Sequence, residues 1–339
     1  MQHGLLRRFG SPAQVLAAAP PEIAQFAGDG VASALARGAD ERLVERTLRW
    51  LDSPGRHLIA LGEAAYPPAL LESGDPPTLL YAMGRPELLQ SPCFAIVGSR
   101  NATPQGRVDA QAFARAMSDA GLCIVSGLAL GVDAAAHRGG LEGRSSSVAV
   151  MGTGADIFYP RSNRELAQRL AEAGCVATEF CLGTPSAAGN FPRRNRLISG
   201  LARGVLVVEA NARSGSLITA RLAADQGRDV FAIPGSIHSP LSKGCHKLIK
   251  EGAKLVENAD DILVELGMGP APERARRPEA ASAYPLLAAM GRDPVSLDQI
   301  AHRTGLAAAA LGAQLSLLEI AGDVAALPGG RFQRLERAP

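Results

Sequence analysis

Short apolar runs and amphipathic stretches of helical period alternate with unusual regularity through the middle of this chain, from Phe94 to Leu266. The expected strands are Phe94–Val97, Leu122–Val125, Val148–Met151, Val176–Glu179, Val205–Glu209, Asp229–Ile233 and a short Lys254–Val256. The expected helices are Arg107–Ala120, Val132–Leu141, Asn163–Ala173, Asn195–Leu201, Leu217–Gln226 and Cys245–Glu251. This alternation predicts an α/β fold: an extended Rossmann-like, doubly wound and mainly parallel sheet.

The residues before this region show two other patterns. Short amphipathic segments at Ala13–Leu16, Glu22–Phe26 and Leu43–Leu51 predict a small helical domain. Further along, His57–Leu61 and Thr78–Ala82 read as strands separated by a Pro-rich loop. We expect these two strands to extend the sheet that follows.

The residues after the sheet predict a linker and a further domain. Gly267–Ala281 is rich in Pro, Arg, Glu and Ala, a composition typical of linkers. Tyr284–Met290, Leu297–Thr304 and Ala307–Leu318 read as three helices, and Gly322–Leu335 reads as a hairpin, which together predict a winged helix. The expected division is therefore a helical domain at 1–55, the Rossmann-like domain at 56–267, a linker at 268–281 and the winged helix at 282–339.

Composition narrows the class of protein. No run of 18 uncharged apolar residues occurs and no signal peptide follows Met1, so we expect a cytoplasmic protein without a membrane segment. The five cysteines show no CxxC spacing and are expected to be reduced core thiols rather than metal ligands or disulfides. A net charge of +2 does not indicate nucleic acid by itself, so any electrostatic argument rests on local clusters.

One such cluster is the run from Phe191 to Gly200, in which Arg193, Arg194 and Arg196 stand close together with no acidic residue among them. Three guanidinium groups so arranged are suited to an anion such as phosphate. Phe191 is expected either to stack on a base or to pack in the core, and Asn195 either to orient the arginines or to cap the helix expected there.

A second cluster, Gly98-Ser99-Arg100, follows the first strand of the predicted sheet. Gly98 lets backbone N–H groups approach an anion closely, and Arg100 adds a permanently charged planar group. If the strands follow the common order 3-2-1-4-5-6, the first and fourth strands flank the ligand-binding crevice. The order therefore predicts that Arg100 and the arginine run share one site.

Three more strand-end loops contribute small and polar residues at the same edge. After the second strand, Asp133 is expected to cap a helix and His137 to pack in the core. After the third, Arg161 either tracks a nucleic-acid backbone or is a solvated surface residue. After the fifth, Glu209 is expected to pair with an arginine, and the same loop offers hydrogen-bond donors from Ser214, Gly215 and Ser216.

The chain lacks the HExxH, GxSxG and Walker A motifs and shows no paired carboxylates in one loop, so we expect a binding protein without a cofactor rather than an enzyme. The candidate binding residues are Gly98, Ser99, Arg100, Arg161, Phe191, Arg193, Arg194, Asn195, Arg196, Ser214, Gly215 and Ser216.

The motifs closely resemble those of the DNA-processing protein A family, also called DprA or Smf. The resemblance is carried, in the family's order, by Gly98-Ser-Arg100, Ser126-Gly-Leu-Ala-Leu-Gly-Val-Asp133, Gly152-Thr-Gly-Ala-Asp-Ile-Phe-Tyr-Pro160, Phe191-Pro-Arg-Arg-Asn-Arg196, Ser214-Gly-Ser-Leu-Ile-Thr-Ala220 and Ala232-Ile-Pro-Gly235. It covers roughly residues 57–266. The terminal domains match more loosely, the first resembling a sterile-alpha-motif or helix-hairpin-helix module and the last a winged helix.

The resemblance implies a homodimer that binds single-stranded DNA, protects it and helps load RecA during natural transformation. It also implies a DNA pocket lined by Arg100, Phe191 and Arg194, with Arg196 as a further candidate. The chain departs from the family at Ala188, where many relatives carry a lysine, and Arg193 or Arg161 is expected to supply that charge.

Two other functions remain open on the sequence. The first is a nucleotide-processing enzyme related to phosphoribohydrolases, whose Pro-Gly-Gly-x-Gly-Thr loop is represented here only by Ala232-Ile-Pro-Gly-Ser236. The second is a winged-helix regulator of duplex DNA, although the expected recognition helix Ala307–Leu318 contains no Arg or Lys.

Overall fold

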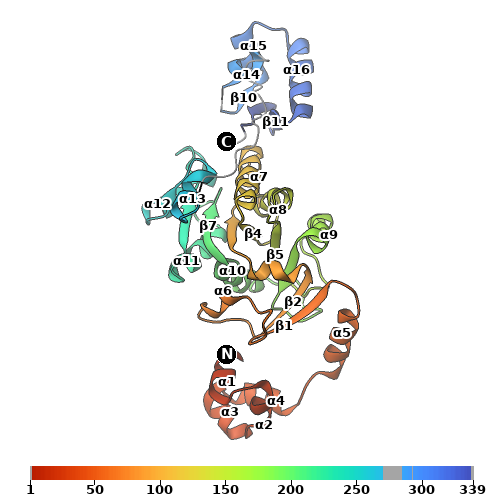
Figure 1. The fold of residues 1–339 in the computed structure, drawn as a ribbon. Helices are drawn as coiled ribbons and strands as arrows, with labels where there is room; N and C mark the ends of the chain where they lie inside the picture. Colours follow the sequence, from red (N-terminus) through yellow and green to blue (C-terminus); the bar gives the residue numbers. More distant parts are fainter. Residues whose placement is uncertain (1, 270–284, 292, 337–339) are drawn as a thin grey trace.

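The computed structural model describes residues 2–269, 285–291 and 293–336. Figure 1 shows a central α/β body, with a group of small helices at the N-terminal end and a second small body at the C-terminal end. Most of the predicted linker at 268–281, and Tyr284 at the start of a predicted helix, lie outside the described residues.

The central body is built on a nine-stranded sheet in the order β1-β2-β6-β5-β4-β3-β7-β8-β9. Strands β3 to β9 are parallel to one another, whereas β1 and β2 form an antiparallel pair whose second strand is also antiparallel to β6. The predicted mainly parallel sheet and its extension by the first two strands are thus confirmed. The strands are β1 Arg56–Ala60, β2 Leu79–Gly84, β3 Cys93–Val97, β4 Cys123–Ser126, β5 Ser147–Val150, β6 Cys175–Thr178, β7 Ala202–Val207, β8 Asp229–Ala232 and β9 Lys254–Leu255.

The strand order differs from the predicted 3-2-1-4-5-6. The chain winds outward from β3 through β4 and β5 to β6, and then crosses back to place β7 on the other side of β3. The order reverses between β3 and β7, so the first and fifth predicted strands, not the first and fourth, flank the crevice. The prediction was wrong because the pattern of apolar runs indicates which segments form the sheet. It does not indicate on which side of the existing strands the next strand is added after a crossover.

The helices cover both faces of the sheet, and the side chains of each strand alternate between two cores. Phe94 and Ile96 of β3 pack with α7, α8 and α13, whereas Ala95 and Val97 pack with α10, α11 and α12. The helices of this body are α6 Pro68–Leu71, α7 Pro104–Asp119, α8 Val132–Glu142, α9 Arg164–Ala173, α10 Asn190–Leu201, α11 Ser216–Asp225, α12 Lys243–Lys250 and α13 Ala259–Glu265, with 3-10 turns η1 Pro86–Gln90, η2 Arg161–Asn163 and η3 Pro240–Ser242.

Helix α10 begins at Asn190, several residues before the predicted Asn195. Pro192 is compatible with this early start, because the first four backbone N–H groups of a helix have no intrahelical partner. The arginine run therefore lies within the first turns of the crossover helix rather than in a loop ahead of it.

The N-terminus is helical, as predicted. Helices α1 Gln2–Phe9, α2 Pro12–Ala17, α3 Pro20–Ala27 and α4 Asp29–Ala36 enclose a small core of their own. Helix α5, Glu41–Leu51, belongs instead to the central body, because Trp50 is buried beside Tyr81 of β2, with 5.7 Å between the ring centroids.

The C-terminal body has the predicted three helices and hairpin. They are α14 Pro285–Met290, α15 Leu297–Thr304 and α16 Ala308–Ala321, with a three-stranded sheet in the order β10-β12-β11 formed by Val295–Ser296, Arg331–Arg334 and Val324–Leu327. Helix α16 extends past the predicted Leu318 and ends where Gly322 adopts a left-handed conformation.

One compositional expectation has a structural counterpart. Cys93, Cys123, Cys175 and Cys245 are buried and free, as predicted for core thiols, whereas the free thiol of Cys181 is exposed. Within the described part of the chain, no single helix is long and apolar enough to cross a membrane; α15 and α16 meet that criterion only as a pair bent by 109°.

Candidate nucleic-acid interface

The loop after β3 is clamped at the edge of the sheet where the strand order reverses. Ser99 N donates to Glu209 O at 2.6 Å, and Val132 N donates to Ser99 O at 3.2 Å. A Cβ on Gly98 would lie 2.7 Å from Val132 Cγ2 and 2.9 Å from Glu209 O, so this position requires glycine. The clamp fixes the backbone immediately before Arg100, whose side chain is exposed.

Arg100 forms one end of an arginine–aromatic stack. Its guanidinium carbon lies 5.4 Å from the ring centroid of Phe191, and the Phe191 ring lies 5.6 Å from that of Tyr159 at an interplanar angle of 38°. A Cβ on Gly152 would lie 2.9 Å from the Phe191 ring, so this glycine allows the ring to lie on the backbone of the loop after β5. We call Arg100, Phe191 and Tyr159 the edge stack.

The edge stack joins the two sequence clusters that were expected to share a site. The crossover helix α10, rather than neighbouring strands, brings Phe191 to Arg100. Tyr159 was not among the predicted site residues. The sequence showed only an aromatic residue in a strand-end loop. That pattern is equally consistent with a Tyr-Pro pair that stiffens the loop.

Arg194 points into the protein and is only 4% exposed. Its Nη1 donates to Gly127 O at 2.6 Å and to Val150 O at 2.5 Å, joining the ends of β4 and β5. A Cβ on Gly127 would lie 2.3 Å from this nitrogen. Burial lowers the pKa of Arg194 to about 10, so the side chain stays charged at neutral pH.

Asp133 supports the same loop from α8. One oxygen of its buried carboxylate accepts hydrogen bonds from Gly127 N at 3.1 Å and Ala129 N at 3.4 Å. Burial raises its pKa and the nearby Arg194 opposes that shift. The predicted capping role was wrong: Gly131 occupies the N-cap of α8, and Asp133 in the first turn binds N–H groups of the preceding loop.

His137 packs in the core, as expected, with both ring nitrogens hydrogen-bonded. Its Nε2 accepts from Leu128 N at 3.3 Å, so the proton lies on Nδ1, which donates to Ser147 Oγ at 2.7 Å. Burial, with the neighbouring charge of Arg194, lowers its pKa to about 3. His137 is therefore neutral at physiological pH and fixes the loop after β4.

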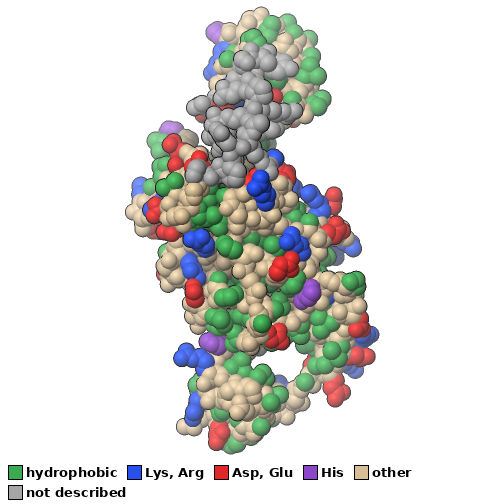
Figure 2. Space-filling model, viewed as in Figure 1, with side chains coloured by type: hydrophobic (Ala, Val, Ile, Leu, Met, Phe, Trp, Pro, Cys, Tyr) green, Lys and Arg blue, Asp and Glu red, His purple; other side chains and the backbone are tan. Residues whose placement is uncertain are grey.

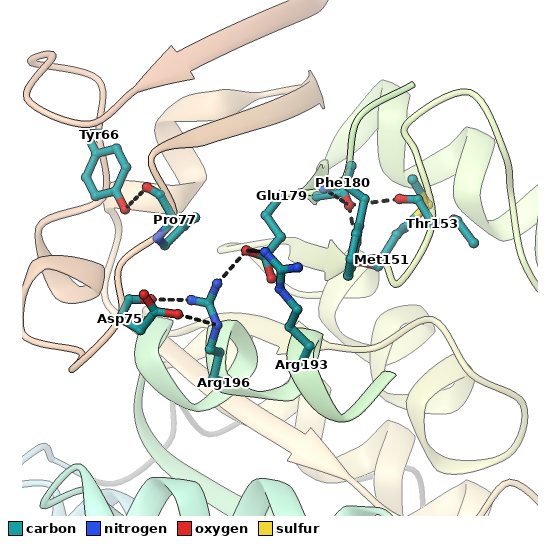
Figure 3. A network of polar contacts seen from close by, with 10 residues as sticks. Tyr66, Asp75, Pro77, Met151, Thr153, Glu179, Phe180, Arg193 and Arg196 are labelled. Atoms are coloured by element: carbon teal, nitrogen blue, oxygen red, sulfur yellow. Dashed lines mark hydrogen bonds and ion pairs between the residues drawn. The ribbon is translucent and has the colours of Figure 1, made fainter. Parts of the chain in front are cut away.

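Arg193 and Arg196 converge on one buried carboxylate at the end of β6 (Figure 3). Arg193 Nη2 lies 3.2 Å from Glu179 Oε2, and Arg196 pairs with the same oxygen and donates to Asp75 O at 2.5 Å. The side chain of Arg193 is 56% exposed, whereas that of Arg196 is 15% exposed. Only Arg193 of the run therefore presents much of its charge to solvent.

The predicted pairing of Glu209 with an arginine was wrong. Its two oxygens accept from Thr103 N at 2.9 Å and Thr103 Oγ1 at 2.6 Å, and Thr103 is the N-cap of α7. The acid that pairs with arginines is Glu179, which ends the fourth predicted strand. Both glutamates end apolar runs, so the sequence did not distinguish them without the strand order.

The remaining candidates lie around this edge. Asn195 Nδ2 reaches Gly215 O at 3.5 Å, and Ser214 Oγ lies 2.7 Å from Ser216 Oγ at the start of α11. Arg161 is exposed on η2. Among the residues that the structure describes, no group of three or more His, Cys, Asp or Glu side chains is placed to hold a metal ion.

The fold and its edge define a doubly wound α/β protein whose strand-end loops present an arginine–aromatic stack. The family model of DNA recombination-mediator protein A matches residues 57–267, and that of the DprA winged helix domain matches residues 270–330. The chain belongs to the DprA/Smf family of recombination mediators, and its C-terminal body is the winged helix predicted from the sequence.

Two relatives support this family assignment. Protein Smf of Escherichia coli K12 is 44% identical over 306 residues, covering 87% of this chain and 82% of that protein. DNA processing protein DprA of Streptococcus pneumoniae is 48% identical over 200 residues, covering 59% of this chain and 71% of that protein.

Two solved structures share the fold. The crystal structure of Streptococcus pneumoniae DprA superimposes with a TM-score of 0.69 at 38% identity, covering 78% of this chain and 92% of that one. A Helicobacter pylori DprA structure, described for its single-stranded DNA binding mode, has a TM-score of 0.57 at 31% identity and covers 62% of this chain and 95% of that one.

Proposed function

We propose that this chain binds single-stranded DNA at the edge stack and acts by holding the strand rather than by catalysing a reaction on it. The observation that carries the proposal is the position of Arg100 against Phe191 and Tyr159 at the sheet edge where the strand order reverses. Open α/β sheets bind their ligands at this edge.

The chemistry of the stack favours an unpaired strand. An aromatic ring offers a stacking surface to any base, and an arginine offers donors to the adjoining phosphate. Tyr159 is 43% exposed and Phe191 is half-buried, so a base has access to the rings without displacing the core. In a duplex the base faces are covered by neighbouring pairs, and these rings have no base to contact.

The other candidate residues divide into two roles within the proposal. The exposed residues Arg193, Arg161 and Gly215 and the half-buried Ser214 are accessible for phosphate contact. The buried or clamped residues shape the edge and hold its loops, and these are Gly98, Ser99, Arg194, Asn195, Arg196 and Ser216. Arg194 therefore acts by positioning the loops after β4 and β5.

Membership of the recombination-mediator family extends the proposal. We infer that the chain works as a homodimer, protects incoming single-stranded DNA and helps load RecA during natural transformation. Co-purification of RecA with DNA-bound protein, and a mass measurement in solution, test these two partners separately.

The DNA-binding proposal is tested by titrating single- and double-stranded oligonucleotides at two salt concentrations. With three to five phosphate contacts, the plot of log affinity against log salt has an expected slope of about −2 to −3.5. Arg100→Ala is expected to weaken binding to every sequence and to reduce the slope by about 0.7.

Arg115→Ala is the matched control, because Arg115 is a half-exposed arginine near the other end of α7. It is expected to leave both affinity and slope unchanged. Equal affinities of wild type and Arg100→Ala would remove the edge stack from the DNA site. Release of free base from a nucleoside monophosphate by the purified protein would contradict a purely binding role.

A further inference from the structure

An arginine-lined cleft lies beside α5, outside the edge stack. Its volume is about 460 Å³, and its walls are Arg42, Arg46, Arg49, Trp50, Asp156 and Leu182. The three arginines recur at intervals of three and four residues along α5, so they lie on one face of the helix. Figure 2 shows basic and acidic side chains close together at the lower right, where Figure 1 places α5.

Arg46 is the fixed member of the three. It is paired with Asp156, whose other oxygen accepts from Gly183 N at 2.8 Å. A Cβ on Gly183 would lie 2.4 Å from Arg46 Nη1, so the guanidinium packs closely against the backbone at a position that has no side chain. Arg46 thereby joins α5 to the loops after β5 and β6, and it neutralises the one acidic wall of the cleft.

Arg42 and Arg49 lie one turn to either side of Arg46 and keep their charge available. The side chain of Arg49 is 70% exposed, and its 3.6 Å contact with the equally exposed Glu45 is weak in water. Arg42 is exposed and makes no ion pair with any residue that the structure describes. Two guanidinium groups of the cleft that Trp50 also lines are therefore free to bind an anion.

The cleft and the edge stack share one loop. Asp156 precedes Tyr159 by three residues, so their Cα atoms are at most about 11 Å apart. Tyr159 contacts Phe191 at one end of this segment, and Asp156 contacts Arg46 at the other. A DNA strand that leaves the stack along this loop arrives at the cleft.

We propose that Arg42 and Arg49 bind backbone phosphates of the same single strand beyond the edge stack, so that α5 lengthens the DNA site. This inference rests on the proposed function and deepens it. The guanidinium groups match phosphate oxygens, and an open cleft accommodates a chain that passes through it.

The fluorescence of a tryptophan in the wall of the cleft reports on binding there. Trp50 is the single tryptophan of the chain, is 7% exposed and forms a wall of the cleft. Labelled oligonucleotides of about 4 and about 16 nucleotides span the site sizes of common single-strand binders. We expect both to bind by fluorescence anisotropy, but only the longer one to change the emission of Trp50. Unchanged emission at saturation with the longer strand overturns the proposal.

A double variant, Arg42→Gln with Arg49→Gln, gives an independent readout. It is expected to weaken binding of the longer strand roughly tenfold and to reduce the salt slope by about 1.4, while leaving the shorter strand unaffected. Retained binding of the shorter strand also shows that the variant is folded. Arg7→Gln with Arg8→Gln is the control, because it removes the same charge from exposed positions of α1 outside the cleft.

The outcomes separate the two proposals. Equal losses for both strand lengths, or an equal loss in the α1 control, overturn the role of the cleft and leave the edge stack standing. Failure of the wild-type protein to bind either strand overturns the proposed function itself, and the cleft with it.

Discussion

Three neighbouring arginines of α10 occupy three different environments, and their burial decides what each one does. Arg193 is largely exposed, Arg196 is paired with Glu179, and Arg194 is buried among backbone carbonyls. Removing one partner of a buried charge pair is costly, because the other charge is left without compensation. Arg193 is therefore the member of the run that faces solvent, whereas Arg194 and Arg196 stabilise the fold.

Substituting Arg194 is expected to destabilise the protein far more than substituting its neighbour. Arg194→Met removes the donor to two carbonyls and the charge that most opposes the burial of Asp133, at an expected cost of about 3–5 kcal/mol in the free energy of unfolding. Arg193→Met, on the exposed side, is expected to cost about 1 kcal/mol or less. Urea unfolding of both variants checks this, and equal costs would contradict the assigned roles.

Phe191→Ala is expected to have the opposite profile, with a large effect on DNA binding and a small one on stability. Loss of a base-stacking ring typically costs about 1–3 kcal/mol of binding. Phe191→Tyr keeps a ring of similar size and is expected to retain most of the affinity. Anisotropy titrations of the two variants measure the difference; an affinity of Phe191→Ala equal to that of wild type would mean that no base stacks there.

At the scale of elements, the sequence predicted which segments form strands and helices because each apolar run has a clear period. The place of each strand in the sheet was not predictable from that pattern. The crossover of α10 from β6 to β7 depends on how the helix packs against the sheet, through contacts distant in sequence such as Leu197 and Ile198 in the core.

The candidate site shows the same division. Arg100 and Phe191 were expected together and lie together, although the strand order behind that expectation was wrong. Tyr159 and Glu179 were missed as partners, because their contacts join loops of different strands. The burial of Arg194 was not predictable either, because the sequence does not distinguish a buried arginine from an exposed one.

Helix α7 contains a group that makes stability depend on pH. Burial raises the pKa of Asp109 to about 6, and the nearby Glu209 and Glu336 add to the shift, against the hydrogen bond from Gln105. A carboxyl whose pKa is raised in the folded state binds its proton more tightly there than in the unfolded chain. Its contribution to stability is therefore full below about pH 4 and is lost as pH rises to about 6.

Asp109→Asn keeps the hydrogen bond to Gln105 and removes the titration. The stability of wild type relative to this variant is expected to fall by up to about 1.4 kcal/mol per pH unit between pH 4 and 6, and then to level off. Urea unfolding at several pH values measures the difference. A constant difference across this range would show that Asp109 is not buried as described.

At the scale of the whole molecule, the described residues form separate hydrophobic cores. The C-terminal body has its own core around Ile300 and Leu315, and the small N-terminal helices have theirs around Leu5 and Ile23. A polar contact links the C-terminal body to α7, where Gln105 Nε2 donates to Glu336 O at 2.5 Å and Glu336 N donates to Gln105 Oε1 at 2.9 Å.

Removal of residues 270–339 is therefore expected to leave the central body folded and its DNA site intact. Helix α16, the recognition helix expected from the sequence, contains no Lys or Arg and therefore offers no cation to a phosphate. The truncated chain is expected to bind single-stranded DNA within about threefold of the full chain, with the same salt slope. A reduced slope would mean that the C-terminal body contributes cations to the site.

At this scale too, we expect the edge stack to select an unpaired strand over a duplex. Competition at one salt concentration measures this preference: a labelled single strand bound to the wild-type protein is displaced by unlabelled single-stranded or duplex DNA of the same sequence. The single strand is expected to compete at far lower concentration than the duplex, and Phe191→Ala is expected to narrow this gap. Equal competition by the duplex would contradict it.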